Sequence, residues 1–324
     1  MRELVRTVFA RGLSGADEDV VGLAALDDGA ALRIGDRWLV YTTDTHVVKP
    51  PFFPGGDIGR LAVAGTVNDL AMMGVTEPLG LACAVVLEEG FAREALLRIQ
   101  DSIEQACREA GTSIHTGDTK VMGRGELDGI VINTTGFGFT ERLVRDHGLR
   151  PGDDIVITGT LADHGFAVLV ERHGLDLEGE LRSDVAPLNG LVAAALAAGG
   201  EAVVAMKDPT RGGLAGALHE LAEKSGVGIG LEEAALPVRP GVRAASELLG
   251  IDVLHVANEG KAVLGVRPEE TKRVLEALRA HPLGAEARRI GSCSGDSPGR
   301  VVLDTGFGRR LVAESDGELL PRIC

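Results

Sequence analysis

Acidic residues interrupt several apolar segments of this sequence, at positions where a carboxylate needs a partner. Asp44 directly follows the strand-like run of residues 38–43, and Asp28 lies in a turn before another strand-like run. Asp69 falls on the apolar stripe of a helix predicted over residues 57–73. A carboxylate on a buried helical face is costly unless it is paired. A cation is the natural partner of Asp69, and hydrogen bonds from backbone N–H groups are the alternative.

Two glycine-containing segments carry groups that bind phosphate. Gly117-Asp118-Thr119-Lys120 combines a carboxylate for Mg²⁺, a hydroxyl group and an ammonium group for phosphate in one short loop. Residues 208–213 precede a predicted helix whose first N–H groups can bind an anion beside Arg211. An ordinary capped helix with an early proline is the alternative. The known nucleotide loops, GxxxxGK[ST] and the kinase catalytic loop, are absent, so a nucleotide would need a different architecture.

Two further residues have side chains suited to proton transfer or nucleophilic chemistry. Glu259 lies in the segment Ala257–Lys261 after an apolar run, where a carboxyl group can exchange protons. Cys324 is the final residue printed, three positions after Pro321 in a polar segment. Proline lacks a backbone donor and stops helices, so we expect an extended, mobile tail. A terminal cysteine without a function is the alternative.

The other three cysteines and the overall composition limit the possible functions. Cys83 lies in an apolar strand-like run and Cys107 on the apolar face of a predicted helix, so both read as core residues, and no Cys/His spacing resembles a zinc site. Nothing suggests a disulfide framework, which favours a reducing compartment. The net charge of −15 argues against a nucleic-acid or anionic-membrane partner. With no signal-like or membrane-spanning run in the sequence, we expect a soluble, cytoplasmic protein.

Strand and helix patterns alternate irregularly, which predicts an α+β fold rather than a doubly wound parallel sheet. Residues 91–110 give the clearest helical periodicity, and Gly111 ends it. The turn at residues 151–154 suggests a domain boundary. We therefore expect one domain over residues 1–150, a second over 151–310, and a tail over 311–324.

Six segments together resemble a known protein family. They are residues 52–59 (FFPGGDIG), 65–74 (GTVNDLAMMG), 116–120 (TGDTK), 208–213 (DPTRGG), 257–261 (ANEGK) and 321–324 (PRIC). In this order and over nearly the whole chain they resemble HypE, the hydrogenase maturation family, within the PurM-like ATP-binding superfamily. The resemblance implies two PurM-like α+β domains, dimerisation through the N-terminal one, and ATP and Mg²⁺ as cofactors.

The same resemblance implies a reaction and a set of functional residues. HypF would carbamoylate the terminal cysteine, ATP would drive dehydration of the S-carboxamide to a thiocyanate, and the HypC–HypD complex would accept the cyano group for the iron of [NiFe]-hydrogenase. The implied catalytic residues are Cys324, Lys120 and Glu259. The implied ATP-binding residues are Asp44, Asn68, Asp69, Gly117, Asp118, Thr119, Lys120 and Arg211, and the implied metal ligands are Asp28, Asp44, Asp69 and Asp118. The alternatives are a PurM-like kinase or synthetase acting on a free small molecule, and a non-enzymatic scaffold.

Overall fold

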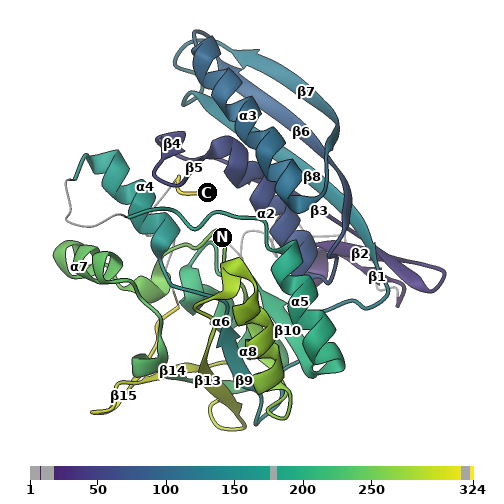
Figure 1. Cartoon of the computed structure of the whole chain (residues 1–324), viewed down its shortest axis with the longest axis vertical. Coiled ribbons are helices and arrows are strands. Elements are labelled where there is room, and N and C mark those ends of the chain that lie inside the picture. Colours follow the sequence, from purple (N-terminus) through teal and green to yellow (C-terminus); the bar gives the residue numbers. More distant parts are fainter. Residues whose placement is uncertain (1–7, 9–17, 176–180, 315–321) are drawn as a thin grey trace.

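The computed structural model describes residue 8 and residues 18–175, 181–314 and 322–324, which form two mixed α+β units (Figure 1). The N-terminal unit is built on a six-stranded sheet with the order β1-β2-β3-β8-β6-β7. Its strands are β1 (Val20–Val21), β2 (Ala30–Ile34), β3 (Arg37–His46), β6 (Pro78–Glu88), β7 (Ile114–Met122) and β8 (Ile130–Thr140). Only the β6–β7 pair is parallel among the pairs described in this sheet. The short strands β4 (Phe52–Phe53) and β5 (Gly56–Asp57) form a separate hairpin.

Two helices cover one face of the N-terminal sheet (Figure 1). Helix α2 (Ile58–Met72) begins at Asp57, whose side chain accepts hydrogen bonds from the N–H groups of Gly59 and Arg60 at 2.8 and 3.0 Å. It is buried on nearly all sides because it lies between the sheet and helices α3 and α5. Helix α3 (Arg93–Ala110) buries one stripe and ends at Gly111 with φ of +71°. The two predicted helices are confirmed.

The opposite face of the N-terminal sheet is exposed along much of its length. Side chains alternate between faces along a strand, so Tyr41 of β3 and its register partner Phe137 of β8 share this outward face. Tyr41 and Phe137 are 42% and 38% exposed. Exposed aromatic side chains that are neighbours on one sheet face are typical of a surface that binds another protein.

The second unit is built on a seven-stranded sheet with the order β10-β12-β9-β13-β11-β14-β15. Its strands are β9 (Asp154–Ile157), β10 (Val203–Lys207), β11 (Gly228–Glu232), β12 (Val263–Val266), β13 (Arg288–Ser294), β14 (Val301–Asp304) and β15 (Arg309–Leu311). Helices α5 (Asn189–Gly199) and α8 (Thr271–Ala280) pack against one face and α6 (Gly213–Ser225) against the other. Helices α4 (Asp163–His173) and α7 (Pro240–Leu249) pack together beside the sheet. The predicted α+β class is confirmed, and the predicted boundary at residues 150 and 151 falls between β8 and β9.

The last three residues contact both units, through Val47 and Lys49 of the N-terminal unit and His164 of α4, and they lie close to β5 (Figure 1). The N–H of Val47 donates to the carbonyl of Cys324 at 3.2 Å, and the N–H of Lys49 donates to the carbonyl of Arg322 at 3.1 Å. The Ile323 side chain is 2% exposed and packs in the apolar cluster around α2. Residues 315–321 of the predicted mobile tail lie outside the described residues, so its mobility stays a prediction. Among the described helices, none is long and apolar enough to span a bilayer.

Candidate functional site

A cavity of about 230 Å³ lies between the two units, and most of its lining is charged. Its acidic residues are Asp28, Asp44, Asp69, Asp208, Glu220 and Glu259. Its cationic residues are Lys207 and Arg211, and Cys324 also lines it. The structure therefore brings together the carboxylates Asp28, Asp44 and Asp69, the guanidinium of Arg211, the carboxyl of Glu259 and the thiol of Cys324, all of which the sequence had singled out.

The N-terminal unit supplies its acids from β3 and α2. Asp44 shares the face of β3 that carries Thr42, and the Thr42 hydroxyl donates to Oδ2 of Asp69 at 3.0 Å. Helix α2 approaches this strand closely because residue 65 is glycine. A Cβ atom there would lie 2.7 Å from Cε1 of His46 and 3.3 Å from Oδ2 of Asp44, too close for any other residue without rearrangement.

The second unit supplies a buried cation that faces these acids. Lys207 ends β10, and its ammonium group contacts Asp28 of the N-terminal unit. The same ammonium lies 3.0 Å from Glu220 of α6. Burial lowers the pKa of Lys207, but the neighbouring carboxylates Asp28, Glu220 and Asp146 outweigh burial and leave this pKa well above its ordinary value. Lys207 therefore remains charged and neutralises part of the acidic lining.

The six acidic residues that line the cavity outnumber its two cationic residues, so part of the acidic charge is not neutralised. Burial, followed by repulsion from Asp208, Asp44 and Asp28, raises the pKa of Asp69 well above its ordinary value. Burial and the charge of Asp28 raise the pKa of Asp208 to about 8. Burial, Asp208 and Asp44 likewise raise the pKa of Glu259. Carboxyl groups that resist ionisation together are a favourable site for an added cation, because its charge restores their ionised forms.

The donor set suits a hard cation that keeps part of its own hydration. Only oxygen ligands line the acidic wall, which fits Mg²⁺ rather than a softer metal. Among the described residues, no group of three or more His, Cys, Asp or Glu side chains is close enough to enclose a metal alone. Mg²⁺ commonly binds through one or two carboxylates plus phosphate oxygens and water. The geometry therefore fits a metal that arrives with a phosphorylated ligand.

Two buried side chains beside the cavity have polar atoms without a hydrogen-bond partner in the described part of the chain. They are Oε1 of Glu259 and both ring nitrogens of His46, although Nε2 of His46 lies 3.4 Å from Oδ2 of Asp44. A buried polar atom without a partner is rare and often marks a ligand site. The carboxyl of Glu259 can thus donate or accept a proton at the cavity.

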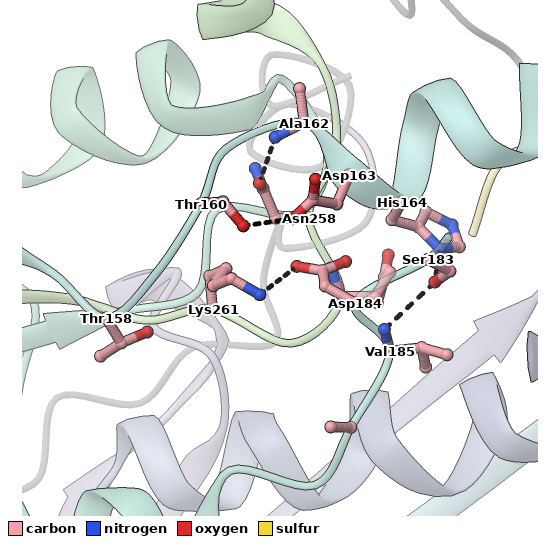
Figure 2. A network of polar contacts seen from close by, with 12 residues as sticks. Thr158, Thr160, Ala162, Asp163, His164, Ser183, Asp184, Val185, Asn258 and Lys261 are labelled. Atoms are coloured by element: carbon pink, nitrogen blue, oxygen red, sulfur yellow. Dashed lines mark hydrogen bonds and ion pairs between the residues drawn. The ribbon is translucent and has the colours of Figure 1, made fainter. Parts of the chain in front are cut away.

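The segment around Glu259 is fixed by ionic and amide contacts (Figure 2). Asp184 accepts a hydrogen bond from the Glu259 N–H at 3.1 Å and pairs with Lys261 at 3.0 Å. Asn258 accepts from the N–H of Ala162 at 2.7 Å. These contacts fix the backbone on both sides of Glu259.

Gly117, Asp118, Thr119 and Lys120 do not line this cavity. They lie on the edge strand β7, where Asp118 and Lys120 pair in register with Ala84 and Val86 of β6 on the outward face of the sheet. Asp118 and Lys120 lie 3.4 Å apart and are about two-thirds exposed. Within one chain they point away from Asp69, so the structure separates them from the other candidate residues.

Asn68 also does not line the cavity. Its amide group donates to the carbonyls of Ala186 and Glu259, both at 3.2 Å, and its oxygen accepts from the N–H of Leu188 at 2.8 Å. Asn68 thus joins α2 to the second unit, and its predicted contact with ATP stays a prediction.

Sequence reasoning did not select Lys207, Asp208, Glu220 or His46 as site residues. A charged pair directly after the apolar strand of residues 203–206 was the available signal for Lys207 and Asp208. His46 follows Asp44 by two positions, the period that places both side chains on one face of a strand. Glu220 carries no such signal, because an acidic residue on a helix is usually solvated.

Comparisons with known proteins agree with this geometry. Residues 26–140 match the family model described as AIR synthase related protein, N-terminal domain, and residues 150–304 match the corresponding C-terminal domain model. A carbamoyl dehydratase HypE of Rhizobium leguminosarum bv. viciae is 47% identical, with 100% of this chain and 92% of the relative covered. A putative hydrogenase expression/formation protein of Methanocaldococcus jannaschii is 46% identical, with 100% and 96% covered.

Solved structures of HypE proteins are also similar to this chain. A chain from a crystal structure of the HypE–HypF complex superposes with a TM-score of 0.89 at 42% identity, covering 96% of this chain and 99% of that one. A crystal structure of HypE in complex with ATP superposes with a TM-score of 0.85 at 40% identity, covering 100% and 96%.

Proposed function

Because this chain belongs to the HypE family of carbamoyl dehydratases and is an enzyme, we propose that it dehydrates an S-carboxamide on its own Cys324 to a thiocyanate at the expense of ATP. The observation that carries this proposal is that Cys324 lines the same cavity as Asp69, Asp208 and Glu259. A sulfur placed among buried carboxyls can present an attached carboxamide to a nucleotide held there. The cyano group would then serve the iron of [NiFe]-hydrogenase.

The proposed chemistry follows from the poor leaving ability of an amide oxygen. The carboxamide oxygen attacks the γ-phosphorus of ATP, ADP leaves, and one N–H proton is lost. Phosphate then leaves from carbon with its bonding electrons, the second N–H proton is lost, and the C≡N bond forms. Each step needs a proton acceptor, and the buried, unpaired Oε1 of Glu259 is the group best placed among the described residues. We assign Lys120 a role at the transferring phosphate, although it must reach that phosphate from outside its own chain's cavity.

We propose that ATP binds with Mg²⁺ in the cavity between the units. Asp28, Asp44 and Asp69 would hold the metal, which supplies charge stabilisation for phosphoryl transfer. Arg211 lies at the turn before α6 and would bind phosphate oxygens together with nearby N–H groups. A HypE relative whose crystal structure contains ATP supports this assignment. Gly117, Asp118 and Thr119 are proposed to contact the nucleotide from the same strand as Lys120.

We further propose a homodimer formed through the outward face of the N-terminal sheet. That face is exposed at the aromatic residues Tyr41 and Phe137, and it also carries Asp118 and Lys120. If two copies dock through this face, Asp118 and Lys120 of one copy can lie near the cavity of the other copy. HypF is proposed as the carbamoyl donor, because the relative solved with HypF has nearly the same fold. The HypC–HypD complex is proposed as the acceptor of the cyano group.

Mass spectrometry of the C-terminal peptide tests this function. After incubation with HypF, carbamoyl phosphate and ATP, a carbamoyl adduct should appear on Cys324 and then lose one water only when ATP is present. An adduct on Cys83, Cys107 or Cys293 would refute the assignment. A PurM-like kinase or synthetase acting on a free small molecule is the alternative, and it would keep its turnover after deletion of Cys324.

A further inference from the structure

A buried histidine contacts the backbone of the last three residues. His164, in the first turn of α4, is fully buried, and its Nε2 lies 2.7 Å from the carbonyl oxygen of Ile323. Its Nδ1 lies 2.8 Å from Oγ of Ser183. Figure 2 shows His164 and Ser183 facing each other beside Asp184 and Val185. His164 thus links α4 to the residue that directly precedes Cys324.

The hydrogen-bond partners fix which ring nitrogen carries the proton. A carbonyl oxygen only accepts, so Nε2 must carry the hydrogen that binds Ile323. Ser183 Oγ accepts the N–H of Val185 at 3.1 Å, which leaves its own hydrogen for Nδ1. Burial lowers the pKa of His164, so the ring is neutral and Nδ1 can accept. The chain of donors from Val185 to Ser183 to His164 to Ile323 is complete and has one direction.

The same short segment also positions the carboxyl of the cavity. Asp184, the residue after Ser183, accepts the N–H of Glu259 at 3.1 Å and pairs with Lys261. The packing there is tight, because a Cβ on Gly260 would lie 1.8 Å from the carbonyl oxygen of Asp184. Residues 183 and 184 therefore contact His164 on one side and the Glu259 backbone on the other.

We propose that His164 is a positioning residue, whose Nε2–H, oriented by Ser183, holds the Ile323 carbonyl so that Cys324 reaches the cavity beside Glu259. The backbone pairing of Val47 and Lys49 with Cys324 and Arg322 fixes the other edge of the tail. The hydrogen bond from His164 holds the Ile323 carbonyl, while the Ile323 side chain packs in the apolar cluster around α2. The purpose of this contact rests on the proposed function, but the contact itself can be measured without ATP, HypF or any turnover.

Alkylation of Cys324 by iodoacetamide, followed by mass spectrometry of the C-terminal peptide of the full chain, measures how firmly the tail is held. His164→Leu and Ser183→Ala each remove part of the donor chain, and we expect each to raise the alkylation rate of Cys324 by about 3- to 10-fold, the effect of losing one buried hydrogen bond. His164→Gln keeps an N–H donor near the position of Nε2 and should restore a rate within about twofold of the unmodified chain. A purely structural role would make His164→Gln as reactive as His164→Leu.

The protein carries its own control for unfolding. Burial raises the pKa of Cys107 to about 11 and that of Cys293 to about 12, so both thiols should react slowly in any folded variant. A variant in which Cys107 and Cys293 also react quickly has unfolded, and the ¹⁵N measurement on the unmodified protein then tests the proposal. In the unmodified protein, ¹⁵N shifts of the His164 ring should show hydrogen on Nε2. Hydrogen on Nδ1, or a Cys324 rate unchanged by both donor-removing variants in the folded protein, would overturn the proposal.

If alkylation follows this pattern while Cys324 gains no carbamoyl group from HypF, the positioning role stands and the proposed function fails. If the carbamoyl adduct forms and loses water but the variants leave Cys324 equally protected, the function stands and the positioning role fails.

Discussion

The ammonium group of Lys207 contacts the carboxylate of Asp28, and this ion pair joins the second unit to the N-terminal unit at the cavity wall. Both side chains are close to 90% buried. A buried ion pair adds little net stability as a pair, but removing one partner leaves an uncompensated charge. The pair therefore makes the relative position of the two units depend on a charge balance inside the site.

Replacing Lys207 with Met should lower the free energy of unfolding by about 3–5 kcal/mol, because Asp28 and Glu220 lose their cation. Urea denaturation at neutral pH measures the change. Lys272→Met is the matched control, since Lys272 is 90% exposed and pairs with Glu276 on its own helix, so the loss of stability should stay below about 0.5 kcal/mol. The double variant Asp28→Asn with Lys207→Met should recover part of the loss. Equal stability of the Lys207→Met and Lys272→Met proteins would show that the buried ion pair does not contribute to stability.

Replacing Asp69 with Asn should lower the rate of ATP hydrolysis by about 10²-fold while binding of HypF survives, because the amide cannot supply charge to Mg²⁺. The same change should slightly raise the melting temperature without Mg²⁺, since it removes repulsion with Asp208 and Asp44. Asp101→Asn on the exposed side of α3 is the matched control and should change neither quantity. If the Asp69→Asn protein hydrolyses ATP at the wild-type rate, the assignment of Asp69 as a metal ligand is wrong.

Stability without Mg²⁺ should fall between pH 7 and pH 8.5. The pKa of Asp208 is raised from 3.8 to about 8 in the folded protein. Between these two pKa values the folded state binds more protons than the unfolded chain does. Stability is therefore lost as the pH rises through the pKa of about 8. Buried histidines with lowered pKa act in the opposite sense, but only below their unfolded pKa near 6.5, outside this window. Denaturation at the two pH values should show the loss, and Asp208→Asn should reduce it. A flat or rising profile would contradict the charge assignment.

Lys120 should act on the cavity of a second copy, since it lies on the face of β7 that points away from its own cavity. Lys120→Ala and Cys324→Ser proteins should each lack dehydration activity. A mixed dimer of the two contains one site with both native residues, so mixing should restore up to about half of the activity per Cys324, as expected for an interface that exchanges residues. If the activity does not recover after subunit exchange has been verified, Lys120 does not act on the cavity of a second copy.

The control for that experiment uses the two exposed phenylalanines. Phe137→Glu puts a charge into the proposed dimer face and should give monomers in sedimentation measurements and abolish recovery. Phe307→Glu changes a fully exposed residue between β14 and β15 of the other unit, so it should leave both the dimer and the recovery intact.

Local patterns in the sequence were sufficient for the elements and for part of the site. The apolar stripe of α2 identified Asp69 because a carboxylate on a buried face is conspicuous within a single helix. The cap at Asp57 and the end of α3 at Gly111 follow from residue types alone.

Contacts between distant segments were beyond such patterns. Lys207 and Asp28 are 179 positions apart, and His164 and Ser183 belong to different segments, so neither pair leaves a periodic signal. The face on which Asp118 and Lys120 lie depends on the register between β6 and β7, which a short loop motif does not encode.

The tail is seated through the carbonyl oxygens of its last three residues and through the side chain of Ile323. These contacts use backbone carbonyls and the Ile323 side chain, which are chemically the same whether Cys324 carries a thiol, a carboxamide or a thiocyanate. These contacts of the backbone and of Ile323 can therefore hold the tail in the same position before and after the proposed modification of Cys324.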